Sequence, residues 1–303
     1  MDNYTTHVNL TSIPANWALI NAALNIFLAI TATLGNILIL ISLHKVSSIH
    51  PPTKLLFRCL AFTDLCVGLT VQPLFIIIEL NYGAKLNLNS LSHVLNLTDT
   101  ALAFVLCGVS TFTSTALGVD RLLALKLGLR YRKIVTLRRV RCLVICFWLS
   151  CVCGAFMYTF VSYRVSITIS AVLSLLSLIT SVVSYTKIFL KLRQHQAQVQ
   201  QHTHHEQPNG GGVPLNIARY KKTVYSVVYI QLALAVCYAP YIILVIIVHL
   251  NEFRSIGWRI AWSYGVTLLF FNSSLNPILY CWRIKEVRHA VKDTVKRYCF
   301  SSS

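Results

Sequence analysis

The sequence predicts an all-α membrane protein, a seven-transmembrane helix bundle followed by a short amphipathic eighth helix. Hydrophobic residues make up 55% of the 303 residues and charged residues only 12%, too few to cover a soluble protein of this length. Seven apolar stretches are each long enough to cross a bilayer core of about 30 Å, which takes roughly 20 helical residues. These two observations define the fold class.

The seven expected spans follow one another with mostly short connections. The second begins after Pro51-Pro52, a pair that favours the first turn of a helix. The longest connection, residues 194–215, is rich in Gln, His and Gly and is predicted to be a flexible linker. The expected spans are residues 17–43, 53–80, 90–123, 138–161, 165–191, 220–250 and 256–281.

The segment after the last span predicts a helix that lies on the membrane surface. Within residues 283–299, the apolar positions recur at helical spacing and basic residues surround them. Cys299 at its end is a candidate for palmitoylation. The chain is therefore divided into an extracellular N-terminal tail (1–16), a seven-helix domain (17–281) and a cytoplasmic helix with its tail (282–303).

The distribution of basic residues predicts the orientation. With the N-terminus outside, 23 of the 27 lysines and arginines fall on the inner side. The net charge of +18 then reflects topology and contact with membrane lipid, and no nucleic-acid partner is expected. Glycosylation sequons at Asn3 and Asn9 fit an outer N-terminus. None of the ten cysteines lies in an outer loop, so no extracellular disulfide is expected.

Polar residues inside apolar spans are candidates for functional roles. Asp64 lies in the otherwise apolar stretch LAFTDLCVGL. Pro240 and Pro277 each free a backbone carbonyl, for which Asn272 and Asn276 are expected to supply donors. Two more carboxylates, Glu79 and Asp99, lie near the outer mouth. They either meet a cationic peptide or amine or face headgroup water.

One mark in each span, taken in order, resembles the rhodopsin-like (class A) G-protein-coupled receptors over about residues 17–299. The marks are Gly35-Asn36, LAFTD (60–64), Asp120-Arg121, Trp148, Tyr185, CYAP (237–240) and NPILY (276–280). The resemblance implies a plasma-membrane receptor without enzymatic activity, with an extracellular ligand of unknown class and a heterotrimeric G protein as partners.

The resemblance also implies a sodium-binding cluster around Asp64. An ion among oxygen ligands would offset the buried charge. The alternative is a protonated Asp64 that is hydrogen-bonded to Asn36 and Asn276. Apart from this allosteric sodium ion, no cofactor is expected. The residues of the cluster are Asn36, Asp64, Ser110, Asn272, Ser273 and Asn276.

A second implied set forms the activation switch. Asp120 pairs with Arg121 at rest, and on activation Arg121 turns toward the G protein while the sixth helix pivots near Pro240. The alternative for Arg121 is a side chain that only reaches the interfacial water. The switch residues are Asp120, Arg121, Tyr185, Tyr238, Pro240, Pro277 and Tyr280, with Tyr238 in the place of the usual tryptophan.

Several positions depart from the family pattern. Leu122 replaces the tyrosine of the Asp-Arg-Tyr motif, and Asn96 replaces the usual third-helix cysteine. The sixth span has no acidic residue at its inner end to hold Arg121, which leads to the hypothesis of high basal signalling. The missing third-helix cysteine, a second outer loop of only a few residues around Ser162 and the lack of the common proline in the fifth span are loosely similar to the melanocortin-type branch. That branch has Asp-Pro where this chain has Asn276-Pro277.

Two other classes of membrane protein fit the sequence less well. A transporter or channel needs a continuous polar path, whereas the intramembrane polar groups are expected to cluster in the inner half. An intramembrane enzyme needs a nucleophile with a base, or a metal set, and no span holds one. The histidines at 202, 204 and 205 lack the cysteine or carboxylate spacing of a metal site.

Overall fold

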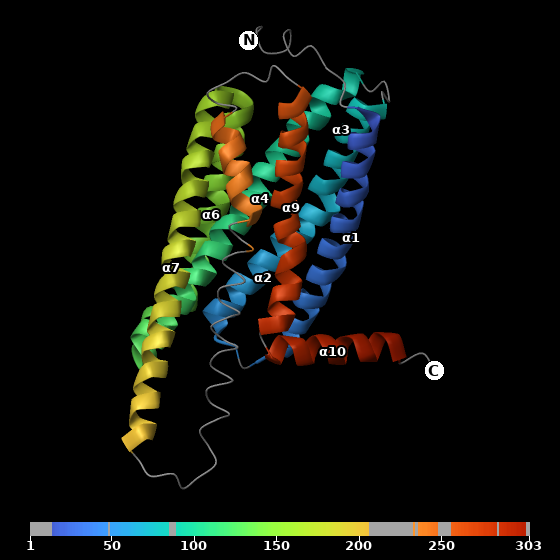
Figure 1. Cartoon of the computed structure of the whole chain (residues 1–303). Coiled ribbons are helices and arrows are strands. Elements are labelled where there is room, and N and C mark those ends of the chain that lie inside the picture. The colour runs from blue at the N-terminus through green and yellow to red at the C-terminus, as the bar shows by residue number, and fades with distance from the viewer. Residues whose placement is uncertain are drawn as a thin grey trace.

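The computed structural model describes residues 14–47, 49–84, 89–205, 233, 236–247, 256–283 and 285–300. Within these residues every regular element is helical (Figure 1). Five helical segments are long and apolar enough to cross a membrane, and they match the first five predicted spans. These segments are Ala15–Lys45, Pro51–Gly83, Leu91–Ile134, Leu137–Val161 and Arg164–Lys191.

The remaining two spans are represented differently. The sixth is described over the helix Val236–Ile247, a short apolar segment around Pro240. The seventh forms a full-length helix, but because it contains many polar residues it is less apolar than the five segments named above. The labelled helices are α1 (Ala15–Lys45), α2 (Pro51–Cys66), α3 (Gln72–Ala84), α4 (Asn89–Leu127), α5 (Tyr131–Ile134), α6 (Leu137–Phe156), α7 (Tyr163–His205), α9 (Ile256–Arg283) and α10 (Lys285–Phe300).

Local irregularities join these helices without breaking the spans. A π-helical turn, Val67–Val71, carries α2 directly into α3, and another, Met157–Val161, extends α6. A 3-10 turn at Gly128–Arg130 joins α4 to α5. The connection between the fourth and fifth spans is then only Ser162, as short as the sequence predicts.

The predicted linker 194–215 is wrong in its first part, because α7 continues to His205. Residues 194–205 contain no Gly or Pro, and Gln and Ala are good helix formers, so nothing stops the helix there. Residues 206–215 lie outside the described residues.

Helices α1 and α4 each pack against several other helices. Helix α1 packs against α2, α3 and α9, while α4 packs against α2, α6 and α7. Helix α10 lies across the end of the bundle and packs against α1 and α9 (Figure 1). Val287 of α10 is buried, and Lys45 Nζ donates to Thr294 Oγ1 at 2.9 Å. The predicted amphipathic eighth helix is therefore confirmed.

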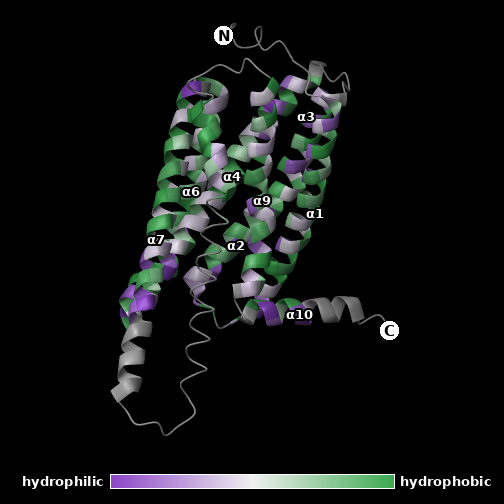
Figure 2. Ribbon diagram, in the orientation of Figure 1, coloured by the Kyte–Doolittle hydropathy of each residue, from purple (hydrophilic) through white to green (hydrophobic). Residues whose placement is uncertain are grey.

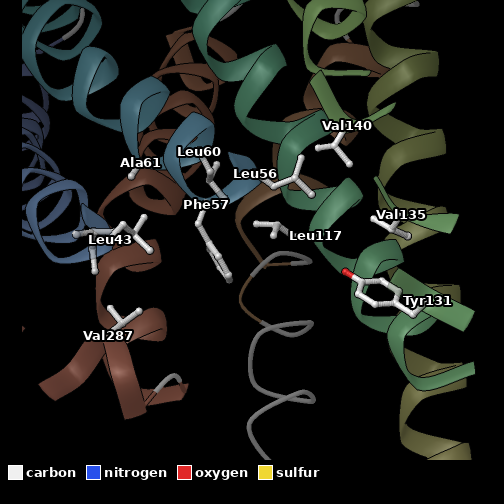
Figure 3. Packing of buried hydrophobic residues seen from close by; sticks show 11 residues of the cluster. Leu43, Leu56, Phe57, Leu60, Ala61, Leu117, Tyr131, Val135, Val140 and Val287 are labelled. Atoms are coloured by element: carbon white, nitrogen blue, oxygen red, sulfur yellow. The ribbon is translucent and has the colours of Figure 1, made fainter. Parts of the chain in front are cut away.

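Apolar side chains both fill the bundle and cover its outside. Figure 3 shows the largest inner cluster, in which Leu56 and Leu60 of α2 meet Leu117 of α4 near Tyr131. Along the flanks of α6 and α7 the helices are mostly hydrophobic (Figure 2), and large side chains such as Leu149 are exposed. An exposed apolar surface of this extent suits a protein whose solvent is lipid.

Candidate functional site

Asp64 is fully buried and forms the centre of a polar cluster between α2, α4 and α9. Its Oδ1 accepts hydrogen bonds from Ser110 Oγ and Ser273 Oγ, each at 2.9 Å. Its Oδ2 accepts from Asn276 Nδ2 at 2.7 Å. The structure thus brings together four of the six residues expected around the ion, here named the Asp64 cluster. All three donors are uncharged, so none of them neutralises the carboxylate.

Asn272 and Asn36, the other two expected members, make different contacts. Asn272 Nδ2 donates to Tyr238 Oη at 3.0 Å, which ties α9 to the helix Val236–Ile247. Asn36 Nδ2 donates to the backbone carbonyls of Ala32, at 2.8 Å, and Ser273, at 3.1 Å. Neither of these bonds goes to the Asp64 carboxylate. Asn272 instead extends the cluster toward the sixth helix.

The contact between Asn36 and Ser273 corrects the expectation for Pro277. Pro277 has no N–H, so the carbonyl of Ser273, four residues earlier, has no helical donor. Asn36 on α1 supplies that donor, not Asn272 or Asn276. Gly35 lets the two helices approach, because a Cβ there would lie 2.9 Å from Pro277 Cβ and Cγ. Sequence position alone could not find this donor, since it lies on another helix.

The oxygen atoms around Asp64 could serve as ligands for a small hard cation. A carboxylate and two hydroxyl oxygens converge there, and such cations prefer oxygen ligands. Asn36 Oδ1 is buried and has no hydrogen-bond partner among the described residues, although its amide adjoins Ser273. A buried acceptor left in this state costs roughly 1–3 kcal/mol, which a cation or a water would offset.

Asp120 is buried at the end of α4 and is held by two hydroxyl groups that were not among the expected site residues. Thr53 Oγ1 donates to its Oδ2 at 2.8 Å, and Tyr131 Oη donates to its Oδ1 at 2.6 Å. The Arg121 guanidinium lies 5.6 Å from the centre of the Phe57 ring, within cation–π range. Asp120 therefore joins α4 to α2 and α5. No motif in the sequence signals Thr53 or Tyr131.

The expected switch tyrosines lie inside the bundle. Tyr185 and Tyr238 are buried in one apolar cluster together with Ile242. The ring of Tyr280 meets Phe57 edge-on, with ring centres 4.9 Å apart. Phe57 thus contacts both Arg121 and Tyr280, and it is a residue that sequence reasoning did not single out. Pro240 lies in the described helix two residues after Tyr238.

Glu79 belongs to a second buried polar cluster, and the expectation that polar groups gather only in the inner half is wrong. Glu79 Oε1 accepts from Ser263 Oγ at 2.8 Å and Oε2 from Asn21 Nδ2 at 3.3 Å. Thr267 Oγ1 donates to Asn21 Oδ1 at 2.8 Å, and Asn25 Nδ2 donates to Thr267 Oγ1 at 2.9 Å. We name these five residues the Glu79 cluster.

The two acidic candidates of the outer mouth are both buried but differ in their hydrogen bonds. Glu79 is 4% exposed and Asp99 is 9% exposed, which does not fit carboxylates that simply face headgroup water. Both oxygens of Glu79 are bonded, whereas Asp99 Oδ1 has no partner within the described ranges. The helical spacing of Asn21, Asn25 and Asn36 could have revealed one polar face of α1 in advance.

Three further expectations fall at or beyond the limits of the described residues. Asn3 and Asn9, the expected glycosylation sites, lie outside them. Cys299 lies near the end of α10. The side chains of the other nine cysteines are described, and these nine are free thiols. In the part of the chain that the structure describes, no group of three or more His, Cys, Asp or Glu side chains could hold a metal ion.

Comparison with known proteins decides the family. The family model of the 7 transmembrane receptor (rhodopsin family) matches residues 35–166 and 157–280, most of the chain. The chain belongs to this family. It is therefore a membrane receptor of the rhodopsin type and not an enzyme, and the family implies a seven-helix bundle.

Curated relatives of this rhodopsin-family receptor include melanocortin receptors. Melanocortin receptor 4 of Danio rerio is 24% identical over 284 residues, which cover 91% of this chain and 83% of the relative. Melanocortin receptor 3 of Rattus norvegicus is 22% identical over 272 residues, 88% of this chain and 82% of the relative. The loose similarity to the melanocortin branch is thus confirmed.

Proposed function

We propose that this receptor passes an extracellular signal to a heterotrimeric G protein through movement of its sixth helix about Pro240. The bond from Asn272 to Tyr238 Oη, at 3.0 Å, carries this proposal. It joins α9, which holds the Asp64 cluster, to the helix that contains Pro240. A change at Asp64 therefore reaches the sixth helix through Ser273 and its neighbour Asn272.

The Asp64 cluster is proposed to hold sodium in the resting receptor. When bound, the ion supplies a positive charge that offsets the Asp64 carboxylate. Asp64, Ser110 and Ser273 would hold it, together with Asn36 Oδ1, which has no hydrogen-bond partner among the described residues. The competing state is a protonated Asp64, in which the same hydroxyls remain bonded to the carboxyl group.

The proposed setting is the plasma membrane, with the N-terminus outside. The basic inner segments support this orientation. Asn3 and Asn9 would then be glycosylated, while α10 would lie on the inner leaflet and Cys299 would carry a palmitoyl group.

A ligand with a cationic group is proposed to meet Asp99. Its Oδ1 has no partner within the described ranges, whereas the Glu79 oxygens are already bonded. The curated relatives are melanocortin receptors by name. Melanocortins are therefore the first arm of a ligand screen with a second-messenger readout.

The role of Arg121 can be tested before a ligand is known. In a ligand-free G-protein activation assay, we expect wild-type receptor to exceed empty membranes, because the sixth span offers no acidic partner for Arg121. We expect Arg121→Ala to lower this basal signal at least about tenfold, since the arginine is the proposed G-protein contact.

Arg164→Ala is the matched control, because it removes an exposed arginine at the opposite end of the bundle. It should signal like wild type at equal surface expression. If Arg121→Ala signals as well as Arg164→Ala, the proposed coupling mechanism is wrong. If wild type does not exceed empty membranes, the hypothesis of high basal signalling fails.

A further inference from the structure

The Glu79 cluster lies at the end of the bundle where α1 begins. Glu79 comes shortly before Ala84, the last residue of α3, and Asn21 and Ser263 come within about two turns of the starts of α1 and α9. These three helix ends lie together in Figure 1. In the orientation proposed above this end faces the extracellular side, so the buried carboxyl group lies only a short distance from the outer water.

The side-chain hydrogen bonds of this cluster all run toward the Glu79 carboxylate. Asn25 Nδ2 donates to Thr267 Oγ1 at 2.9 Å, and Thr267 Oγ1 donates to Asn21 Oδ1 at 2.8 Å. Asn21 Nδ2 then donates to Glu79 Oε2 at 3.3 Å, while Ser263 Oγ donates to Oε1 at 2.8 Å. This direction suits an ionised carboxylate, which can only accept hydrogen bonds.

The same side chains can form a second pattern in which Glu79 carries a proton. When the Asn21 amide turns by half a revolution, its Oδ1 accepts from the Glu79 carboxyl group and its Nδ2 donates to Thr267 Oγ1. The Thr267 hydroxyl then donates to the backbone carbonyl of Ser263, which is already 3.0 Å away. Asn25 Nδ2 keeps its bonds to Thr267 and to the Asn21 carbonyl, at 2.9 Å each. Only its contact with Asn21 Oδ1, at 3.3 Å, is given up.

One proton decides between these two patterns. Burial of an ionised carboxylate costs free energy, and protonation removes that cost. The ionised form gains in turn from its donors, because a hydrogen bond to a charged group is about twice as strong as one between neutral groups. Both patterns use the same five side chains and nearly the same bonds, so the helices need not move for the proton to bind.

Helices α3 and α9 bring other ionisable groups close to Glu79. The guanidinium carbon of Arg259 lies 3.8 Å from the centre of the Tyr82 ring, and the charge of Arg259 also acts on Glu79. Tyr264 of α9 is near enough to Glu79 to interact with its charge. Because Arg259 also contacts the Tyr82 ring, it keeps a partner when Glu79 becomes neutral.

Helix α4 contributes two more ionisable groups, whereas the outer half of α1 contains none. Asn96 of α4 donates from Nδ2 to Tyr82 Oη at 3.1 Å, so this part of α4 lies beside α3. Asp99 and His93 each lie three residues from Asn96, the first buried and the second exposed. These two residues are the alternative proton sites at this end of the bundle.

We propose that the Glu79 cluster is a proton-binding site through which extracellular acidity regulates the receptor. A proton from the outer water binds Glu79 Oε2, the Asn21 amide turns, and the Thr267 hydroxyl passes from Asn21 to its own helix. A charge-assisted bond between α1 and α3 is thereby replaced by a weaker bond between neutral groups. Helix α9 also carries Ser273 of the Asp64 cluster, so the regulatory role rests on the proposed function, whereas the proton site does not.

Infrared difference spectra of purified full-length receptor test the proton site without any signalling readout. Spectra at about pH 9 and about pH 5 span much of the range in which perturbed carboxyl groups titrate. Wild type should gain a carbonyl band of a protonated carboxyl group that Glu79→Gln lacks. Asp99→Asn is the matched control, because it removes another buried carboxyl group, and it should keep the band. A difference spectrum that Glu79→Gln leaves unchanged would overturn the proton site.

Asn21→Leu tests the second hydrogen-bond pattern. It should keep the Glu79 carboxyl band but shift it to higher frequency, because the carboxyl group no longer has the amide oxygen as acceptor. Thr267→Val removes the hydroxyl that changes its acceptor and should shift the same band less, since Asn21 still accepts from Glu79. A band at the wild-type frequency in Asn21→Leu would show that the Asn21 amide does not turn.

The regulatory role is tested in intact cells, where only the outer medium is acidified. The ligand-free signal of wild type should change at least about fivefold between neutral and mildly acidic medium, the lower end of the usual coupling between two sites. Glu79→Gln should signal equally in both media. A wild-type signal that is the same in both media overturns the regulatory role, and a carboxyl band in the same receptor shows that the proton site itself stands.

His93→Gln is the matched control in cells, because histidine is the side chain that ordinarily titrates in this range and His93 is exposed. It should respond to acid like wild type. Loss of the response in His93→Gln but not in Glu79→Gln would assign the effect to His93 and overturn the regulatory role of Glu79.

Discussion

Asp64 is a buried carboxyl group whose three hydrogen-bond donors are neutral, so the proposed sodium ion is what would offset its negative charge. Ser110, Ser273 and Asn276 all donate to it, but none brings a positive charge. We expect sodium chloride, compared with choline chloride, to raise the thermal unfolding midpoint of the wild type. At ten times the dissociation constant, binding adds about 1.4 kcal/mol of stability. Asp64→Asn should abolish the difference between the two salts.

Glu79→Gln is the control for this prediction, because Glu79 is another buried carboxylate that accepts hydrogen bonds from neutral side chains. It should keep the sodium effect in full. An equal sodium effect in wild type and Asp64→Asn would remove the ion from the Asp64 cluster and leave the protonated carboxyl as the explanation. Loss of the sodium effect in Glu79→Gln alone would show that the ion binds in the Glu79 cluster and not in the Asp64 cluster.

At the scale of the element, α9 depends on α1 for one hydrogen bond to its backbone. Asn36 supplies the donor that Pro277 withholds from the Ser273 carbonyl. We expect Asn36→Ala to destabilise the receptor by about 1–3 kcal/mol, the cost of an unmet buried group. In the Pro277→Ala background the cost should be smaller, because the substituted alanine restores a helical N–H for the same carbonyl. Thermal unfolding of wild type, the two single variants and the double variant measures the difference.

Thr31→Ala serves as the control on the same helix. The Thr31 hydroxyl donates only to carbonyls of its own helix in the described structure, so its removal should cost little in either background. Additive effects of Asn36→Ala and Pro277→Ala would show that the two residues do not act on one carbonyl. A cost below that of Thr31→Ala would contradict the role given to Asn36.

At the scale of the whole molecule, non-covalent contacts hold the described helices together. The Glu79 cluster connects α1, α3 and α9 near one end, and all nine described cysteines are free. We expect a reducing agent to leave the thermal unfolding midpoint unchanged, because no disulfide among these nine restrains the unfolded chain. Unfolding with and without dithiothreitol measures this. A clear drop would reveal a disulfide and contradict the prediction.

The loss of Ser263, by comparison, should matter. Its hydroxyl donates to Glu79 Oε1 at 2.8 Å and connects α9 to α3. We expect Ser263→Ala to lower the same unfolding midpoint, because it leaves a buried carboxylate oxygen without its donor. This contrast separates a bundle held by hydrogen bonds from one held by a covalent bridge.

The order and approximate ends of the helices can be predicted from the sequence because their causes are local. Length and apolar composition select each span, and Pro51 begins α2 where the sequence predicts. The end of α7 is mispredicted, since composition alone does not distinguish a polar helix from a linker. The convergence of Ser110, Ser273 and Asn276 on Asp64 follows from the family resemblance rather than from spacing.

By itself, then, the sequence determined the fold class, the family and the residues at its centre. Tertiary structure alone decided which partner each polar group has: Asn36 for Ser273, Tyr131 for Asp120, and Asn21 with Ser263 for Glu79. These contacts depend on how each helix is rotated and shifted against its neighbours. That rotation is set by packing across the whole bundle, as where Gly35 meets Pro277, and no local pattern encodes it.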